Sequence, residues 1–452
     1  MINLEKEVRR IAQLPDQERL QALKRIIPRK TVQAILRKTR RRQRYCRRLP
    51  GWFMVWFVVG LGFYCRDSYC QVYRWLQAHN HVPGRTTLCE ARQSLGVPAF
   101  YLLYNEVVRL LAEITTPGAF YRDLRLMALD GFVVDLPDRP ALARIFGRPQ
   151  SGRSAGAFPQ ARVLALCETG THVIWKHLIK PIRCGEVTMA PTLLRHLHKN
   201  MLLMWDRNFL SYANVALVQQ REAHLLARIK KHMVFKPLRR FRDGSYLAKL
   251  YRAGWYRDHD QGGVLVRIIE YTFKDRNRPG AGEKHRLLTT LLHPSLDPAK
   301  TLIELYHQRW ELELTIDELK THQRERPVLR SETPAGVIQE IFGLLLGHYI
   351  VRVLMFEAAK PHRIDPRRLS FTGTLKILRC RLPQCPKSAK GLVKWYGMLL
   401  EEIAAERLPE RRDRISPRVI KRKMSRWPKK RPKHRDYPQP TKKFRESIVM
   451  LN

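Results

Sequence analysis

The sequence predicts a multidomain α/β protein, and three observations support this prediction. The chain has 452 residues, more than one ordinary hydrophobic core organises, so two to four domains are expected. Apolar residues make up 44% of the chain, which is enough to fill such cores. Helical patterns dominate the first hundred or so residues and the last third of the chain. The region between them is rich in short apolar runs typical of β-strands.

The charge balance predicts a polyanionic partner. Lys and Arg number 85 against 40 acidic residues, giving a formal net charge of +45. Nucleic acid is the partner expected for so basic a chain, and an anionic membrane surface is the alternative. The apolar stretch Trp52–Tyr64 has 13 residues, whereas a membrane-spanning helix needs about 20. We therefore interpret it as a buried core helix, and we expect a cytoplasmic, DNA-associated protein without a secretory signal.

Residues 1–118 are predicted to form a helical DNA-binding domain. A basic run, Arg37–Arg48, leads into the apolar core helix. Two further helices, joined by a Pro-Gly turn, are expected to follow, the second capped by Thr86 or Thr87 and ended by Gly96. This arrangement suits a helix-turn-helix, although any helical hairpin has the same pattern.

The spacing of apolar residues changes near residue 124 from a helical pattern to one typical of strands. "LRLMALDGFVVDLPD" begins as a strand, and "ARVLALCE" and "THVIWKHLIK" form a predicted hairpin. A helix over 188–199 and the apolar run "MLLMW" follow. Three strands, a helix and a further strand fit an α/β core with the mixed sheet of the ribonuclease H type. This core is assigned to residues 119–212 and 301–360, with 213–300 as a β-rich insertion.

The remaining segments are predicted to be helical. Residues 335–359 form a strongly apolar helix that is expected to pack on the sheet. Residues 361–452 form a helical C-terminal region that ends in a basic, Pro-rich flexible tail. The eight cysteines lack the C-x2-C spacing of a zinc site, so we interpret them as reduced thiols.

Two aspartates stand where a metal site would need them. Asp130 closes the run "LMALD" and Asp206 closes "LLMWD". A carboxylate at the end of a buried strand, beside a turn, is held rigidly and still faces solvent, which suits a hard divalent cation. Two or three such carboxylates can hold two Mg²⁺ ions about 3.5–4 Å apart, the pair that drives phosphoryl transfer. Asp135 and Asp138 are alternatives to Asp130, although Asp138 is more typical of a residue that orders a turn.

The stretch "YHQRWELELTIDELK", residues 306–320, is predicted to form one helix. Four of its side chains fall within an arc of roughly 60° at about 100° per residue, beside the buried apolar stripe: Tyr306, Arg309, Glu313 and Lys320. Glu311 and Glu318 are expected to point to solvent. A surface helix with weak intrahelical ion pairs is the alternative interpretation. Glu313 is the third candidate carboxylate, and Asp317 could replace it.

Together these motifs resemble the transposases of bacterial insertion-sequence family four. The resemblance rests on "DG…LPD" at Asp130–Asp138, "DRNF" at Asp206–Phe209, and the spacing Tyr306-x2-Arg309-x3-Glu313-x6-Lys320. It extends from about Arg37 to the basic tail near Arg435. It implies a cut-and-paste enzyme with a ribonuclease H-like core and an Asp-Asp-Glu triad.

The resemblance also implies roles for individual residues. Asp130, Asp206 and Glu313 would bind two catalytic Mg²⁺ ions, for which Mn²⁺ would substitute. Four residues would contact the transposon-end DNA near the scissile phosphate: Tyr306, Arg309, Lys320 and Arg207. Arg207 matches the Arg that follows the second Asp in the family. Trp255 is the candidate for stacking a flipped terminal base, with a structural tryptophan as the alternative.

The expected function is metal-dependent cut-and-paste transposition of an insertion sequence. A homodimer would bind double-stranded DNA at two terminal inverted repeats, nick it by hydrolysis, and join the 3′-hydroxyl ends to target DNA. One alternative is a catalytically silent DNA-binding protein derived from a transposase, against which the intact triad argues. The other is a structure-selective nuclease on the same core, which would not need the helical, basic first hundred residues.

Overall fold

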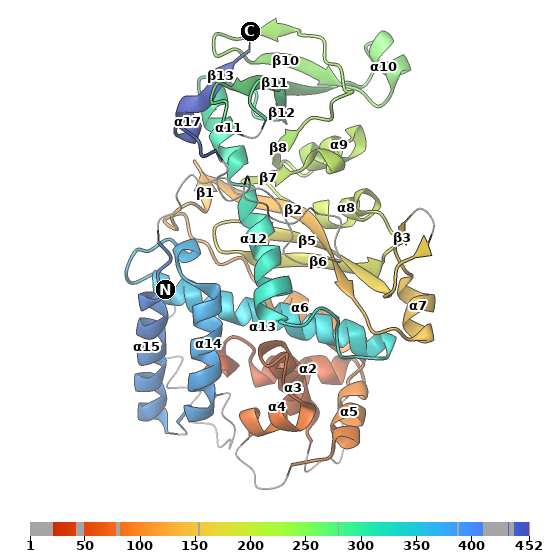
Figure 1. Cartoon of the computed structure of the whole chain (residues 1–452), viewed down its shortest axis with the longest axis vertical. Helices are drawn as coiled ribbons and strands as arrows, with labels where there is room; N and C mark the ends of the chain where they lie inside the picture. The colour runs from red at the N-terminus through yellow and green to blue at the C-terminus, as the bar shows by residue number, and fades with distance from the viewer. Residues whose placement is uncertain are drawn as a thin grey trace. The chain divides into compact units, whose positions relative to one another are not determined.

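The computed structural model describes residues 21–41, 49–77, 82–151, 154–278, 280–386, 388–409, 433 and 438–451. The chain divides into two compact units (Figure 1). The first contains Met1–His196 and Trp310–Leu408, and the second contains Leu197–Arg309 and Pro409–Asn452. Much of the predicted basic tail and of the predicted basic run lies outside the described residues. The end of the chain is described, and the prediction of a flexible tail is wrong there: residues 448–450 pair with residues 271–273 in a sheet, and the N–H groups of Thr441 and Lys442 donate hydrogen bonds to the Asp275 carboxylate. The four-part domain division stays a prediction.

The first unit begins with the predicted helices. α3 is buried along most of its length, which confirms its interpretation as a core helix. α5 begins at Arg85 with Gly84 as its N-cap, so the predicted Thr cap is wrong. Gly84 has the extended backbone that an N-cap needs, and the helix therefore starts before the threonines. The elements are η1(Gln21–Arg25), α2(Arg29–Lys38), α3(Gly51–Phe63), α4(Tyr69–Leu76), α5(Arg85–Gln93) and α6(Gly96–Val107).

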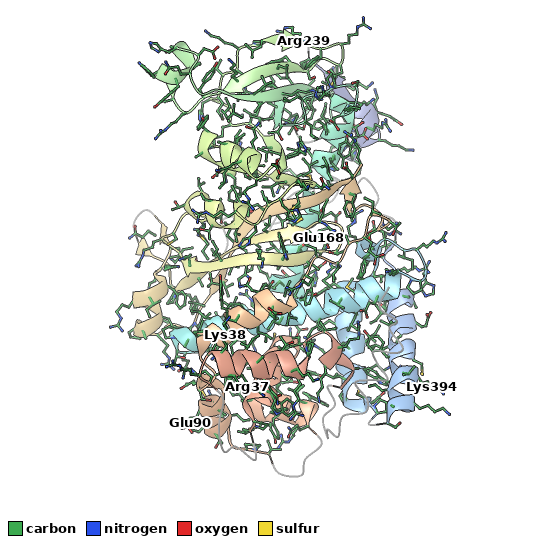
Figure 2. The ribbon with its side chains drawn as sticks, turned by 180° about the vertical axis from the view of Figure 1, so that it is seen from behind. Arg37, Lys38, Glu90, Glu168, Arg239 and Lys394 are labelled. Carbon is green, nitrogen blue, oxygen red and sulfur yellow. The ribbon has the colours of Figure 1, made fainter. Side chains whose placement is uncertain are left out.

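The strands of the first unit form an antiparallel sheet in the order β6-β5-β2, with the two-residue β1 beside β2. The hairpin predicted around residues 169–170 is confirmed as β5 and β6. Figure 2 shows Glu168 at the end of β5, where it is buried and accepts hydrogen bonds from the N–H groups of Leu111 and Ala112. The elements are β1(Phe120–Tyr121), β2(Leu124–Asp135), α7(Pro140–Phe146), β3(Gln150–Ser151), β4(Ser154–Ala155), β5(Gln160–Glu168), β6(Val173–Pro181) and α8(Glu186–Leu194).

Asp130 lies in the middle of β2, so the prediction that it ends a strand beside a turn is wrong. Gly131 continues the strand and pairs with Leu164 of β5. A Cβ atom at Gly131 would lie within 3.0 Å of the Glu186 carboxylate. The glycine therefore marks the close approach of the Glu186 side chain to the strand and not a chain reversal.

The last part of the first unit is helical, as predicted. α13 is buried almost throughout and packs against α3, α6, α14, α15 and β6. Its length and hydropathy would allow it to cross a membrane, but 89% of its apolar window is buried inside the structure, as in the core helix of a soluble protein. The elements are α12(Trp310–Asp317), the π-helix η3(Glu318–Gln323), α13(Pro334–Ala359), η4(Pro366–Arg368), α14(Phe371–Arg381), η5(Leu382–Gln384) and α15(Ala389–Ala405).

The second unit is rich in strands, in the order β7-β8-β12-β11-β10-β9, and β13 pairs with β11. β7 and β8 are parallel and the other described pairs are antiparallel. Residues 232–238 fall within the predicted β-rich insertion but form a loop, and Pro237 in this loop has no N–H to donate to a sheet. The elements are β7(Met201–Trp205), η2(Arg207–Phe209), α9(Tyr212–Gln220), β8(His224–Arg228), β9(Arg239–Arg240), β10(Tyr246–Leu250), α10(Gly254–Asp258), β11(Val264–Phe273), β12(His285–Thr289), α11(Ala299–His307), α17(Phe444–Ser447) and β13(Ile448–Met450).

The predicted α/β class with helical flanks is therefore confirmed, and its largest helical contact depends on two glycines. α3 and α13 cross with their backbones in contact at Gly62 and Gly343. A Cβ atom at Gly62 would lie within 3.0 Å of the Gly343 carbonyl, and one at Gly343 within 3.0 Å of the Val58 carbonyl. Neither backbone can yield locally, so any larger side chain at this crossing must separate the two helices.

Gly343→Ala is expected to destabilise the protein. Overpacking of this kind costs about 1–3 kcal/mol, which exceeds the gain of up to about 1 kcal/mol in helix propensity. Gly397→Ala on α15 is the matched control, because no atom lies within 4 Å of its added Cβ, and it should be neutral or stabilising. Urea unfolding of both variants measures the difference. Equal midpoints for the two would show that the helices separate without cost.

Candidate functional site

Two of the three candidate carboxylates belong to the first unit. Asp130 is half-buried on β2, and its Oδ1 accepts a hydrogen bond of 2.8 Å from the N–H of Gly131. Glu313 is half-buried on α12, which packs against β2 (Figure 1). Burial and then the charge of Asp130 raise the pKa of the neighbouring Cys167 thiol. The carboxyl groups thus come from a strand and a helix that pack together, a rigid setting for oxygen ligands.

The third carboxylate, Asp206, lies in the second unit at the end of β7, as predicted. All five residues of β7 are buried, and Asp206 follows them as the N-cap of η2. Its Oδ1 accepts a hydrogen bond of 2.7 Å from the N–H of Arg207, whose side chain is exposed. The strand fixes the position of Asp206 while its carboxylate remains partly open to solvent.

Tyr306 and Arg309 lie in the second unit, beside the end of β7. The Tyr306 hydroxyl donates a hydrogen bond of 3.1 Å to the carbonyl oxygen of Trp205. Burial raises the pKa of Tyr306; the charge of Arg309 lowers it and that of Asp206 raises it, each by less than burial does, and the phenol is neutral. The Arg309 guanidinium lies 6.0 Å from the centre of the Tyr306 ring. The structure therefore places a neutral hydroxyl, a cation and a carboxylate close together in this unit.

The prediction of one helix over residues 306–320 is wrong. α11 ends at His307, and α12 begins at Trp310. The N–H groups of Gln308 and Arg309 bond to carbonyls three residues back, so the chain tightens and turns there. After Asp317 the helix widens into the π-helix η3. The single arc predicted for the four polar side chains therefore does not exist, and Glu313 and Lys320 belong to the first unit.

The prediction that Glu311 and Glu318 face solvent is also wrong. Both are buried, and each has a carboxylate oxygen 2.9 Å from a ring nitrogen of His172, in the turn between β5 and β6. Glu318 also accepts hydrogen bonds of 3.0 Å from Arg352 and 3.1 Å from His348, both on α13. Burial opposes ionisation, but Arg352 and His172 hold the pKa of Glu318 well below its usual range. We call these five residues the Glu318 cluster.

The Glu318 cluster fixes the helix that carries Glu313 and Lys320. Glu311 lies two residues before Glu313, and Glu318 lies two residues before Lys320. Further along η3, the Gln323 side chain donates to the carbonyls of Gly62 and Leu344 at 3.2 and 2.9 Å. Lys320 itself is half-buried, and burial lowers its pKa. π-Helical turns often occur at functional sites. Here the turn is bonded to the segment between β5 and β6, to α13 and to α3.

The alternative carboxylates have other partners. Asp135 accepts a hydrogen bond of 2.7 Å from Gln160, and Asp138 forms an ion pair with Arg148. Asp317 is half exposed and accepts a hydrogen bond of 2.5 Å from Thr321. Each of these three carboxylates is therefore bound by another side chain of the protein and needs no metal as a partner.

Trp255 is not a buried structural residue. It lies on the short helix α10 and is 57% exposed. Its ring stacks on His259 with centres 4.4 Å apart, which leaves much of the indole open to solvent. An exposed aromatic face of this kind is available for stacking on a base.

The chemistry of the donor set fits a hard divalent ion. Asp130, Asp206 and Glu313 offer only carboxylate oxygens, the ligands that Mg²⁺ prefers. Within the described part of the chain, no three His, Cys, Asp or Glu side chains form a ready-made metal cluster. Asp130 and Glu313 belong to the first unit, and Asp206 belongs to the second.

Glu318→Gln is expected to destabilise the protein by about 3–5 kcal/mol, because it leaves the buried Arg352 without its carboxylate. The neighbouring Asp317→Asn is the control and should change the free energy of unfolding by less than about 0.5 kcal/mol, since Asp317 is half exposed. Urea unfolding of the two variants measures both values. A loss below about 1 kcal/mol for Glu318→Gln would mean that the cluster contributes little to stability.

Comparison with known proteins identifies the family. Residues 121–350 match the model of the transposase DDE domain, and residues 17–105 match that of the insertion element 4 transposase N-terminal domain. The transposase InsG for insertion sequence element IS4 of Escherichia coli (strain K12) is 27% identical over 399 residues, which cover 84% of this chain and 87% of the relative.

Two further comparisons give shorter or weaker likenesses. The putative transposase InsZ of the same organism is 26% identical over 172 residues, 36% of this chain and 56% of that protein. Among solved structures, the piggyBac transposase in its synaptic complex with hairpin DNA has a TM-score of 0.44 and 10% identity, over 88% of this chain and 86% of that one. Because the DDE model alone covers just over half of the sequence and spans Asp130, Asp206 and Glu313, the chain belongs to the DDE transposase family.

Proposed function

We propose that this DDE transposase moves an insertion sequence by a metal-dependent cut-and-paste reaction. It would nick DNA by hydrolysis at the terminal inverted repeats and transfer the freed 3′-hydroxyl ends to target DNA. The observation that carries the proposal is the match of an insertion-element N-terminal domain and a DDE domain, in that order, along one chain. A structure-selective nuclease would not need the first domain, and a silent DNA-binding protein would not need the carboxylates.

The proposed catalytic residues are Asp130, Asp206 and Glu313. Members of the family use divalent metal ions, and we propose two Mg²⁺ ions here, with Mn²⁺ as a substitute. Bound to these carboxylates, such ions would supply activation of the attacking oxygen and stabilisation of the leaving oxygen. The chain's own contribution is to hold Asp130 within a paired strand, Glu313 on a helix anchored by the Glu318 cluster, and Asp206 at the end of a buried strand.

The proposed DNA contacts are Tyr306, Arg309, Lys320 and Arg207. The planar guanidinium group of arginine can donate two parallel hydrogen bonds to phosphate oxygens, and the ammonium group of lysine carries a localised positive charge. Tyr306 is a neutral hydrogen-bonding group, and burial raises its pKa above the usual value. Burial lowers the pKa of Lys320, so an adjacent phosphate would restore the preference of its amine for the charged form.

The proposed partners are the two ends of the element and the target DNA, bound by a homodimer. The net charge of +45 favours a polyanion and predicts binding that weakens steeply with salt. We place the protein in the bacterial cytoplasm, on the nucleoid.

Asp206→Asn and Glu313→Gln should each abolish DNA cleavage while leaving DNA binding in place. Loss of a metal ligand removes several kcal/mol of transition-state stabilisation, so the rate should fall at least about a hundredfold. The measurement uses the full chain, duplex DNA carrying the inverted repeats that flank its own gene, and Mg²⁺, with cleavage and strand-transfer products resolved on gels. Asp317→Asn, a half-exposed carboxylate on the same helix as Glu313, is the matched control and should remain active.

The outcomes separate the candidate functions. Binding without products in the wild type would support the silent DNA-binding protein. Cleavage without strand transfer would support the nuclease. Products that survive Glu313→Gln but not Asp317→Asn would move the third ligand to Asp317.

Trp255→Ala should weaken binding to the cleaved transposon end and leave folding unchanged. Stacking of one base on an aromatic ring contributes about 1–3 kcal/mol, equivalent to roughly a fivefold to hundredfold change in the dissociation constant. Fluorescence anisotropy with duplexes that have an unpaired terminal base measures the effect. Trp255→Phe should retain most of the affinity, and an unchanged affinity in Trp255→Ala would exclude this role.

A further inference from the structure

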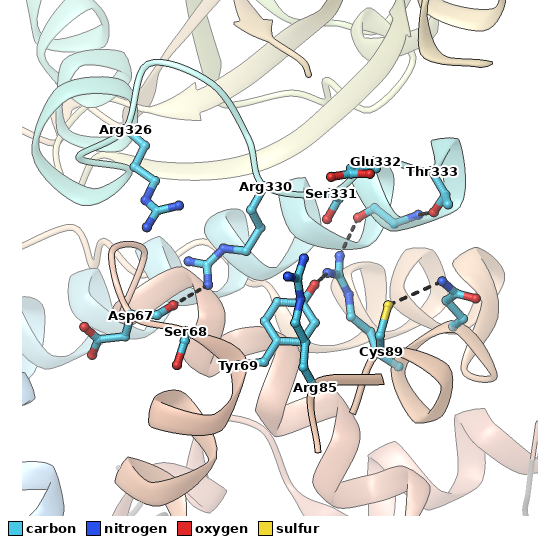
Figure 3. Close-up of a pocket in the computed structure, with 13 residues that line it drawn as sticks. Asp67, Ser68, Tyr69, Arg85, Cys89, Arg326, Arg330, Ser331, Glu332 and Thr333 are labelled. Carbon is cyan, nitrogen blue, oxygen red and sulfur yellow. Dashed lines mark hydrogen bonds between the residues drawn. The ribbon is translucent and has the colours of Figure 1, made fainter. Parts of the chain in front are cut away.

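A pocket of about 470 Å³ lies within the first unit, apart from the residues assigned above (Figure 3). It lies between α4, α5 and the segment that leads from residue 326 into α13. Its lining includes four arginines, Arg85, Arg92, Arg326 and Arg330, and two acidic residues, Asp67 and Glu332. The pocket is therefore rich in positive charge, and the contacts of each group decide how much of that charge a ligand would meet.

The beginnings of three helices line this pocket. Ser68 caps α4, Arg85 is the first residue of α5, and Thr333 caps α13. The start of a helix carries partial positive charge and N–H groups that lack partners within the helix. The helix ends add to the arginine charges in favouring an anion.

Two of the arginines build the wall of the pocket. Arg92 is buried and bonds to Tyr69, to the Gly336 carbonyl and to Gln339. Arg330 donates to the backbone carbonyls of Tyr64, Cys65 and Asp67. These contacts fix the α4–α5 pair against the start of α13, so the pocket has a rigid frame.

The other two arginines present their charge outward. Arg85 is exposed and makes no hydrogen bond or ion pair with any residue that the structure describes. Arg326 is exposed, and its one hydrogen bond within the described chain is a bond of 2.8 Å to the carbonyl of Arg66. Neither has a carboxylate partner there. Figure 3 shows the two side chains on opposite sides of the pocket, Arg85 rising from α5 and Arg326 descending from the segment above.

The two acidic residues do not neutralise these arginines. Glu332 forms an ion pair of 2.7 Å with Arg139, outside the pocket lining. Asp67 accepts a hydrogen bond of 2.7 Å from the Trp75 indole. The exposed guanidinium groups of Arg85 and Arg326 are thus left to attract an anion from solution.

We propose that this pocket binds a backbone phosphate of duplex DNA, with Arg85 as the principal contact and Arg326 as the second. The identification of the polyanion as DNA rests on the proposed function. The exposure of both arginines favours a phosphate on a large surface, because a small anion held by a pocket is usually enclosed by buried donors. Arg85 also lies within the region that matches the insertion-element N-terminal domain.

The test is the salt dependence of DNA binding by the full chain, measured by fluorescence anisotropy without divalent ions so that no cleavage occurs. Each phosphate contact contributes about 0.9 to the slope of log K against log salt, which corresponds to roughly eightfold in affinity at 0.1 M salt. Arg85→Gln should reduce the slope and the affinity by these amounts for any duplex sequence. Arg85→Lys should retain most of the slope, because it keeps the charge.

Lys394→Gln is the charge-matched control. Lys394 is exposed on α15 in the same unit and does not line the pocket (Figure 2). Its removal should leave the slope unchanged. Equal losses in the two Gln variants would show a general effect of net charge and would overturn the assignment of the pocket.

The remaining outcomes distinguish the pocket from the proposed function. An unchanged slope in Arg85→Gln, from a wild type that binds and cleaves DNA, would overturn the pocket assignment and leave the function standing. A wild-type protein that binds no DNA would overturn both the pocket assignment and the proposed function. A rise in the melting temperature of the wild type but not of Arg85→Gln with inorganic phosphate at constant ionic strength, with equal DNA binding, would assign the pocket to free phosphate and overturn the DNA assignment.

Discussion

The ionised carboxylate of Glu318 is the constraint on which the first unit depends. A buried charge is costly unless it is paired and hydrogen-bonded, and Glu318 meets that requirement with Arg352, His348 and His172. These partners come from α13 and from the turn between β5 and β6, so one side chain ties the helical layer, the sheet and the π-turn together. The positions of Glu313 and Lys320 follow from this tie, because both lie within five residues of Glu318 on the same helical segment.

The second unit fixes its candidate residues by a different means. β7 is entirely apolar and buried, and it positions Asp206 through its backbone alone. Tyr306 then bonds to the carbonyl of Trp205, the last residue of that strand. A carboxylate held at a strand end needs no buried ion pairs, and its charge stays partly solvated. The two units therefore hold their candidate carboxylates in two ways. Glu313 lies on a helix anchored by a buried, fully paired carboxylate, and Asp206 lies at the end of a buried strand.

The sequence predicted the elements well where local pattern determines them. The core helix at Trp52–Tyr64, the hairpin around residue 169 and the strand before Asp206 were all evident from apolar runs and turn residues. The sequence failed where a distant partner decides. Nothing local shows that Glu318 meets His172 and Arg352, 146 and 34 residues away along the chain, so a charged side chain between apolar ones was predicted to face solvent. The turn predicted after Asp130 is wrong for a similar reason, because the approach of Glu186 to Gly131 is not visible in a local pattern. The triad itself rests on spacing and family resemblance, and it stays a prediction.

The large positive charge of the chain overstates the number of arginines available to DNA. Arg352 and Arg92 are buried in hydrogen-bond networks, and Arg267 in the second unit is fully buried with Asp243, Ser245 and a backbone carbonyl as partners. Such arginines act as structural cross-links, since the guanidinium can join several acceptors at once. The cations that meet a ligand are those with exposed ends and few partners, such as Arg85 and Arg326. Burial and hydrogen-bond partners, more than composition, therefore indicate which basic residues bind nucleic acid.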